Sequence, residues 1–144
     1  MYMNFIIMFF GSLLIHMYLM PLVMTSSVNH IQLFSLNKFY NATFMASSMV
    51  LLETLMHSSI NVLILSLIGM LMMYIMVKSQ LFINEKQYLK DMVEHHSMAI
   101  LTSTKLLEKE ISIDVKKLAS NILQTQEEEV SLMQKLLVDK DIPK

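Results

Sequence analysis

The chain contains no cysteine, which excludes disulfide bonds, thiolate metal sites and thiol catalysis. It also lacks arginine, so all 11 of its basic residues are lysine. Charge is scarce in the first half, where Lys38 and Glu53 are the only charged side chains before Lys78. With a net charge of -1 and no one-sided basic block, we expect no nucleic-acid partner.

Long apolar runs fill the first half of the chain. Hydrophobic residues make up 54% of the sequence and charged residues 16%, a balance too apolar for a soluble domain of this length. The uncharged run 5–24 is long enough to cross a hydrocarbon layer of about 30 Å as a helix, and it lacks the basic start and small-residue exit of a cleaved signal peptide. Further spans are predicted at 38–57 and 60–77. Residues 1–78 are therefore expected to form a membrane domain with three transmembrane helices in a lipid bilayer.

The second half, residues 79–144, has the amphipathic pattern of soluble helices. Asn84 followed by Gln87 is a capping-box signal, which predicts a helix over about 84–110. Ser112 and Asp114 form a second start signal, for a helix over about 112–139. Since no strand-like alternation occurs, we predict an all-α protein in which three transmembrane helices precede a soluble antiparallel helical hairpin.

Polar side chains interrupt the apolar stripes of both predicted hairpin helices. His96 lies within the first stripe, and Gln126 and Glu129 lie within the second. With the turn centred near Ile111, an antiparallel register brings His96 opposite Gln126. Met92 then lies opposite Val130 and its neighbour Glu129, and Leu89 opposite Met133.

These residues form a candidate site for a soft metal ion. Met92 precedes His95 and His96 by three and four residues, so the three side chains share one helix face. Thioether and imidazole donors suit a copper-like ion, and Glu129 is either a further ligand or an acceptor that orients an imidazole. The alternative is a solvent-facing histidine pair beside ordinary core methionines. The candidate ligands from this pattern are Met92, His95, His96, Gln126, Glu129 and Met133.

The hairpin sequence resembles a known family. The residues that carry the likeness are DMVEHHSMAI at 91–100, VKKLA at 115–119, and then Ile122, Gln126, Glu129 and Met133. Over roughly residues 82–138 they resemble the domain of unknown function three hundred and five family, which is ferritin-like and has copper-binding members. The resemblance implies that His95, His96, Met92 and Met98 are metal ligands. This sequence has Glu94 where the family commonly has proline before the histidine pair.

Ionisable residues inside the predicted spans suggest a second candidate site. His16 and Glu53 lie within apolar segments, where such residues often have a function. Glu53 and His57 share a helix face, which is consistent either with a hydrogen-bonded pair near the interface or with an ion or proton entry point. Methionines near the Lys78 end of the spans are either a thioether path for a soft metal or a result of coding bias.

The leading hypothesis from the sequence is a membrane-anchored protein that binds copper for buffering or hand-off. An enzyme is not expected, because the chain has no Glu-x-x-His pair of the di-iron type, glycine-rich phosphate loop or nucleophile elbow. The alternatives are a structural or assembly membrane protein and a small metal or proton transporter subunit that uses Glu53 and His16. A homo-oligomer could complete a helical bundle.

The sequence does not fix the side of the membrane on which the hairpin lies. Lys38 and Lys78 flank the same membrane face, which by the positive-inside rule predicts a cytoplasmic hairpin. The family resemblance instead suggests export. Both orientations remain open.

Overall fold

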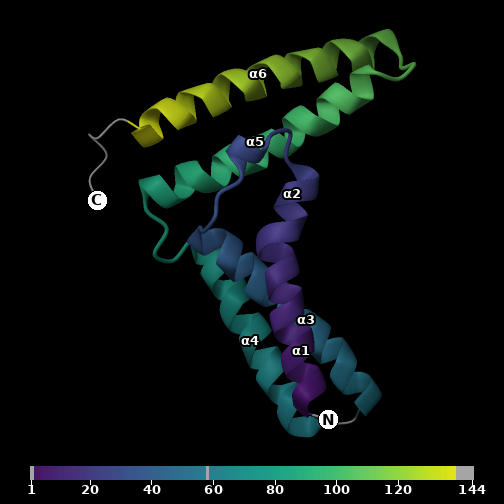
Figure 1. Cartoon of the computed structure of the whole chain (residues 1–144), viewed down its shortest axis with the longest axis vertical. Helices are drawn as coiled ribbons and strands as arrows, with labels where there is room; N and C mark the ends of the chain where they lie inside the picture. Colours follow the sequence, from purple (N-terminus) through teal and green to yellow (C-terminus); the bar gives the residue numbers. More distant parts are fainter. Residues whose placement is uncertain (1, 58, 139–144) are drawn as a thin grey trace. The chain divides into compact units, whose positions relative to one another are not determined.

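The computed structural model describes residues 2–57 and 59–138, except for the side chain of His57. Within this part of the chain every regular element is a helix (Figure 1), which confirms the all-α prediction. The chain divides into two compact units. Unit 1 comprises Met1–Met20 and Leu33–Ile83, and unit 2 comprises Pro21–Gln32 and Asn84–Lys144.

The apolar first half folds into long helices. Helix α1, Tyr2–Leu14, continues through a π-helical turn, Ile15–Leu19, into the short helix α2, Met20–Met24. Helices α3, Leu36–His57, and α4, Ile60–Ser79, follow. These bounds lie close to the ranges 5–24, 38–57 and 60–77 expected from hydropathy. The sequence His57–Ser58–Ser59 also predicts a tight reversal between the second and third spans, and this reversal falls partly outside the described residues.

Helix α3 is the central helix of unit 1, because it packs against both α1 and α4. Its buried side chains are mostly small or hydroxylated, and they are Tyr40, Ala42, Ala46, Ser47, Val50 and Thr54. Gly69 on α4 lies against this surface, where an added Cβ would come within 3.0 Å of Ser47 Oγ. Small residues thus allow α3 and α4 to approach closely, as in packed membrane helices.

Two helical stretches of the described residues are long and apolar enough to cross a membrane. They are Tyr2–Met24 and Ile60–Ser79, and most of their side chains are exposed rather than packed in a protein core. The second predicted span, 38–57, lies within the 22-residue helix α3, which is not apolar enough to count as a membrane-crossing helix. The physical reason is the polar content of α3, which includes Lys38 and Glu53 and several serine, threonine and asparagine residues.

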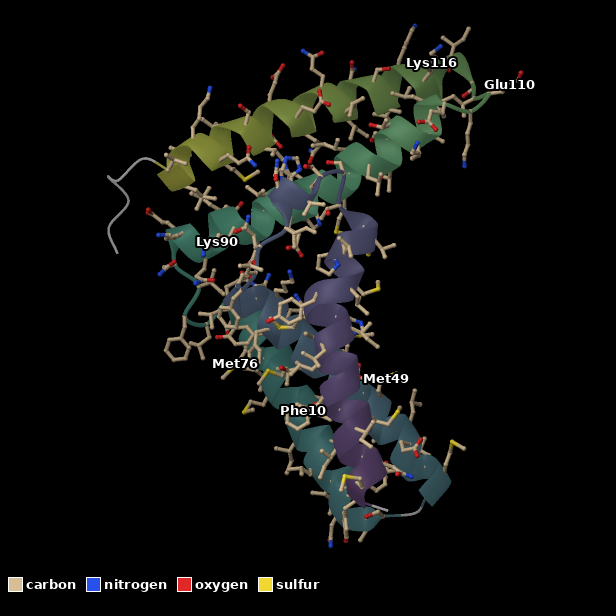
Figure 2. The ribbon with its side chains drawn as sticks, in the orientation of Figure 1. Phe10, Met49, Met76, Lys90, Glu110 and Lys116 are labelled. Carbon is tan, nitrogen blue, oxygen red and sulfur yellow. The ribbon has the colours of Figure 1, made fainter. Side chains whose placement is uncertain are left out.

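Unit 2 is built on an antiparallel hairpin of α5, Glu85–Leu107, and α6, Ile113–Val138. Glu110 and Lys116 mark its turn in Figure 2, and Lys90 lies near the start of α5. The predicted cap is confirmed, since Asn84 Oδ1 accepts a hydrogen bond of 2.9 Å from the Gln87 N–H. Buried apolar side chains form the seam between the helices, and they are Val93, Ile100, Val130 and Met133.

We predict that Asn84→Ala loosens the first turn of α5. Loss of an N-cap costs about 1 kcal/mol, because the helix N–H groups lose their acceptor. Hydrogen exchange of the Gln87 amide should then accelerate on the order of fivefold, as measured by mass spectrometry on the full chain in detergent. Asn121→Ala on the exposed surface of α6 is the matched control. Equal exchange in the two variants would show that the cap contributes nothing.

Candidate functional site

The centre of the candidate site is a contact between His96 on α5 and Glu129 on α6. The His96 Nδ1 atom lies 2.9 Å from the Glu129 Oε2 atom. Nδ1 is buried and is not aligned with the carboxylate as a good hydrogen bond, so the contact is chiefly electrostatic. The His96 side chain is nevertheless 20% exposed, so its accessible part is the remainder of the ring, which carries Nε2.

The observed partner of His96 is one turn further along α6 than the sequence register suggested. The register had brought His96 opposite Gln126, whereas the described contact is with Glu129. Gln126 is half-buried in α6. The predicted register assumed that the midpoint of the turn determines which residues lie opposite each other. In the folded hairpin the packing of the buried seam residues determines this register instead.

The other predicted ligands are distributed unevenly around His96. Met92 lies one turn before His96 on α5 and packs, half-buried, against the core of the hairpin. Met133 is buried within that core. His95 is exposed, with its ring centroid 6.0 Å from that of His96. Met98 follows His96 by two residues, a spacing that turns side chains to different sides of a helix.

The donors of one chain do not complete a conventional metal site. Over residues 2–57 and 59–138, no group of three or more histidine, cysteine, aspartate or glutamate side chains is arranged to hold a metal ion. The nearest approach to such a group is the His96–Glu129 pair. Further donors from this chain would be thioethers, of which Met92 is placed on a neighbouring turn.

A second polar cluster ties the connector, residues 25–32, to α5 within unit 2. Ser97 is fully buried, and its Oγ accepts a 2.9 Å hydrogen bond from the Ser26 N–H. The same Oγ lies 2.8 Å from His30 Nδ1 and 2.9 Å from Ser26 Oγ. One turn away, the Gln32 N–H donates a 3.0 Å hydrogen bond to Glu94 Oε2. The connector is therefore docked along one edge of α5.

An open groove of about 310 Å³ lies beside this docked connector. Its lining comes from the connector and from both hairpin helices, and consists of Ser26, His30, Ile100, Glu127, Val130, Ser131 and Gln134. Burial lowers the pKa of the His30 imidazole below its ordinary value of 6.5. His30 is therefore favoured as the neutral ring in the docked state.

The sequence interpretation missed this connector cluster. Ser97 follows Val93 by four residues and precedes Ile100 by three, so helical spacing alone puts a polar side chain on the buried face. A buried hydroxyl needs a hydrogen-bonding partner, and that was an available signal. The partner itself could not be read from the sequence, because His30 is 67 residues away.

His16 and Glu53, the ionisable residues of the predicted spans, lie on different helices and have different surroundings. His16 lies in the π-helical turn, with its Nδ1 atom 3.1 Å from the carbonyl oxygen of Ser12 one turn earlier. Glu53 is half-buried on α3. The predicted partner of Glu53, the His57 side chain, lies outside the described residues.

Comparison with known proteins identifies one family and one relative. The model of the family described as a domain of unknown function (DUF305) matches residues 78–143, a range that includes α5 and α6. An uncharacterized protein, L153, of Acanthamoeba polyphaga mimivirus is 30% identical over 122 residues, covering 81% of this chain and 80% of that protein. A match of that extent must reach into the first half of the chain. No solved structure matches.

We predict that Ser97→Ala releases the connector. The Ser26 N–H and the His30 ring lose their shorter contacts, with the Ser97 hydroxyl, and keep only longer ones, with the residue 97 carbonyl oxygen at 3.3 Å and Ser26 Oγ at 3.4 Å. A buried polar group that loses its partner costs about 1–3 kcal/mol. Hydrogen exchange over residues 25–32 should increase by at least about tenfold in the full chain. Ser103→Ala, a buried serine of α5 outside the cluster, is the matched control. Unchanged protection in Ser97→Ala would remove the cluster as the anchor.

The docking of the connector should also weaken in acid. Because the docked His30 has the lower pKa, the undocked chain binds the proton more readily, so docking is favoured above pH 6.5 and is lost as the pH falls toward the lowered value. Hydrogen exchange of residues 25–32, corrected for its intrinsic pH dependence, should rise between pH 7.5 and pH 5. His30→Gln should abolish the pH dependence, and its persistence in that variant would contradict the assignment to His30.

Proposed function

This chain belongs to the domain of unknown function (DUF305) family, and we propose that it is a membrane-anchored binding protein for a soft transition metal ion, copper foremost, acting in buffering or hand-off. The description of the family assigns no activity. The proposal therefore rests on the contact between His96 and Glu129.

The His96–Glu129 contact supports the proposal through the chemistry of the imidazole ring. A carboxylate next to Nδ1 can accept its proton, fix the ring orientation and make the other nitrogen a better donor. In His96 the buried Nδ1 faces Glu129, while the accessible part of the ring carries Nε2. Nε2 would bind the metal ion, and Glu129 would orient the ring from behind.

Met92 supports copper over harder ions. Its thioether lies on the turn before His96, at the i, i+4 spacing that allows two side chains to reach one ion. Thioether donors select copper in its reduced state, whereas carboxylate and water ligands favour calcium or magnesium. Among the remaining residues named from the sequence, His95 is exposed, Met98 is half-buried, and Gln126 and Met133 lie in or beside the seam.

Anchoring in a membrane is supported by the exposed apolar surface of unit 1. The stretches Tyr2–Met24 and Ile60–Ser79 are apolar over lengths that suit a bilayer and keep most of their side chains exposed. Helix α3 would be the third span. Its polar residues are tolerable in a bilayer if α1 and α4, which both pack against it, shield them from lipid. Unit 1 would then be a multi-pass anchor for the metal-binding hairpin.

Titration of the full-length protein in detergent micelles with copper(I), and with silver(I) as its redox-inert counterpart, tests this function. His96→Ala should weaken binding by at least about tenfold, since an ion loses its nitrogen donor. Met92→Leu should lower affinity for both ions while keeping the apolar volume, and thus the fold.

His95→Ala is the matched control, because it removes the neighbouring imidazole but leaves the contact with Glu129 intact. The copper(I) affinity of this variant should stay within about twofold of that of the unmodified chain, because replacing an exposed side chain changes the fold little. The proposal is wrong if His96→Ala binds copper(I) as tightly as His95→Ala does, or if the unmodified chain binds neither ion.

A further inference from the structure

The two edges of the α5–α6 seam differ in what covers them. On one edge the connector is docked, through the contacts of Ser26 and His30 with Ser97. On the other edge a shallow groove remains near the turn of the hairpin, lined on α5 by Ser103 and Leu106 and on α6 by Val115, Leu118 and Ile122, with Thr102 and Ala119 at its margins. We call this second edge the open face.

His96 and Glu129 lie on the same open face. His96 precedes Ser103 by seven residues, and Glu129 follows Ile122 by seven, so each lies two helical turns from a groove residue on nearly the same side of its helix. The open face therefore carries apolar side chains near the turn and the imidazole–carboxylate contact further along.

Several apolar side chains on or near the open face of α6 are exposed. Leu118 is 60% exposed, and Leu132, further along α6, is 57% exposed. Leu136 lies seven residues beyond Glu129 and is 39% exposed, so the apolar stripe resumes past the polar contact. Helix α6 thus carries two apolar stripes, one packed in the seam with α5 and one exposed beside it. A second stripe of this kind is typical of a helix that packs against a further helix.

We infer that the open face packs against the same face of a second copy, and that the two copies bind one metal ion between them. This inference rests on the proposed metal-binding function and names the structure of its site. The second copy is the occupant that supplies what the site lacks, because among the described residues of one chain no three histidine, aspartate or glutamate side chains are arranged to hold an ion.

The two copies can be related by a twofold axis that runs along the open face, parallel to the helices. With this axis, residues at each height along the helices meet residues of compatible chemistry. Such an axis keeps each residue at its own height, so apolar groove residues meet apolar groove residues. At the middle level the His96–Glu129 pairs of the two copies meet across the axis, which brings the two His96 rings to one height. Each α5 then lies between two antiparallel α6 helices, as in an up-down-up-down four-helix bundle.

The shared ion would have a closed set of donors. Two His96 rings, each held at Nδ1 by a carboxylate, contribute two nitrogens, and the two Met92 side chains one turn away contribute thioethers. Two nitrogens with two sulfurs suit copper, and burial between the hairpins would exclude water from the ion. The expected stoichiometry is one ion for every two chains.

The test compares two lysine substitutions on α6 of the full-length chain in detergent. Leu118→Lys adds a charge to the groove of the open face, and Gln124→Lys adds the same charge on the outer surface of the helix. Both positions are exposed, so both variants should keep the helicity of the unmodified chain by circular dichroism. Molar mass is measured by light scattering, and copper(I) affinity and stoichiometry by titration of the same samples.

The unmodified chain and Gln124→Lys should be dimers with one copper(I) ion per two chains. Leu118→Lys should shift to the monomer and lose copper affinity on the order of tenfold or more, since half of the donors leave. If Leu118→Lys stays dimeric, or becomes monomeric with unchanged copper affinity, the shared site is overturned while the metal-binding function stands. If the unmodified chain binds no copper(I), both the shared site and the metal-binding function fail.

Discussion

Burial of the seam between α5 and α6 sets the directions of His96 and Ser97, the polar side chains of α5 beside it. Val93 and Ile100 on one helix and Val130 and Met133 on the other are withdrawn from water, which fixes how each helix is rotated about its own axis. That rotation also determines the side of the helix on which each residue at the margins of the seam lies. His96 is consequently turned toward Glu129, and Ser97, one residue later, is turned toward the opposite edge.

The two edges of the seam illustrate how a buried polar group obtains a partner. Ser97 obtains its partners from a distant segment, and its hydroxyl is fully satisfied by the connector. His96 obtains a carboxylate from the facing helix, but the alignment of Nδ1 with that carboxylate is poor. A satisfied cluster stabilises a fixed arrangement, whereas an incompletely paired donor set is the kind of site at which an ion can bind.

The first unit follows a different rule, because its exposed surface is apolar and its interior is comparatively polar. Several serine and threonine hydroxyls of α3 and α4 donate to backbone carbonyls within the same helix, as with Thr54 to Leu51 at 2.6 Å and Ser66 to Leu63 at 2.9 Å, whereas the buried Thr43 hydroxyl has no such bond. These internal bonds allow hydroxylated residues to lie between closely packed helices without unpaired donors. In α3, Ser47 and Thr54 are buried in this way, whereas Asn41 is exposed.

Local sequence signals were sufficient for the helices, their bounds and the α5 cap, because hydrophobic periodicity and capping depend on residues within about one or two turns of each other. They also brought His96 and Glu129 to the same seam. The choice of Glu129 over Gln126 as the contact, and the docking of Ser26 and His30 on Ser97, were settled only by the folded chain. Those pairings join segments far apart in sequence, and they follow from the packing of whole helices rather than from any local preference.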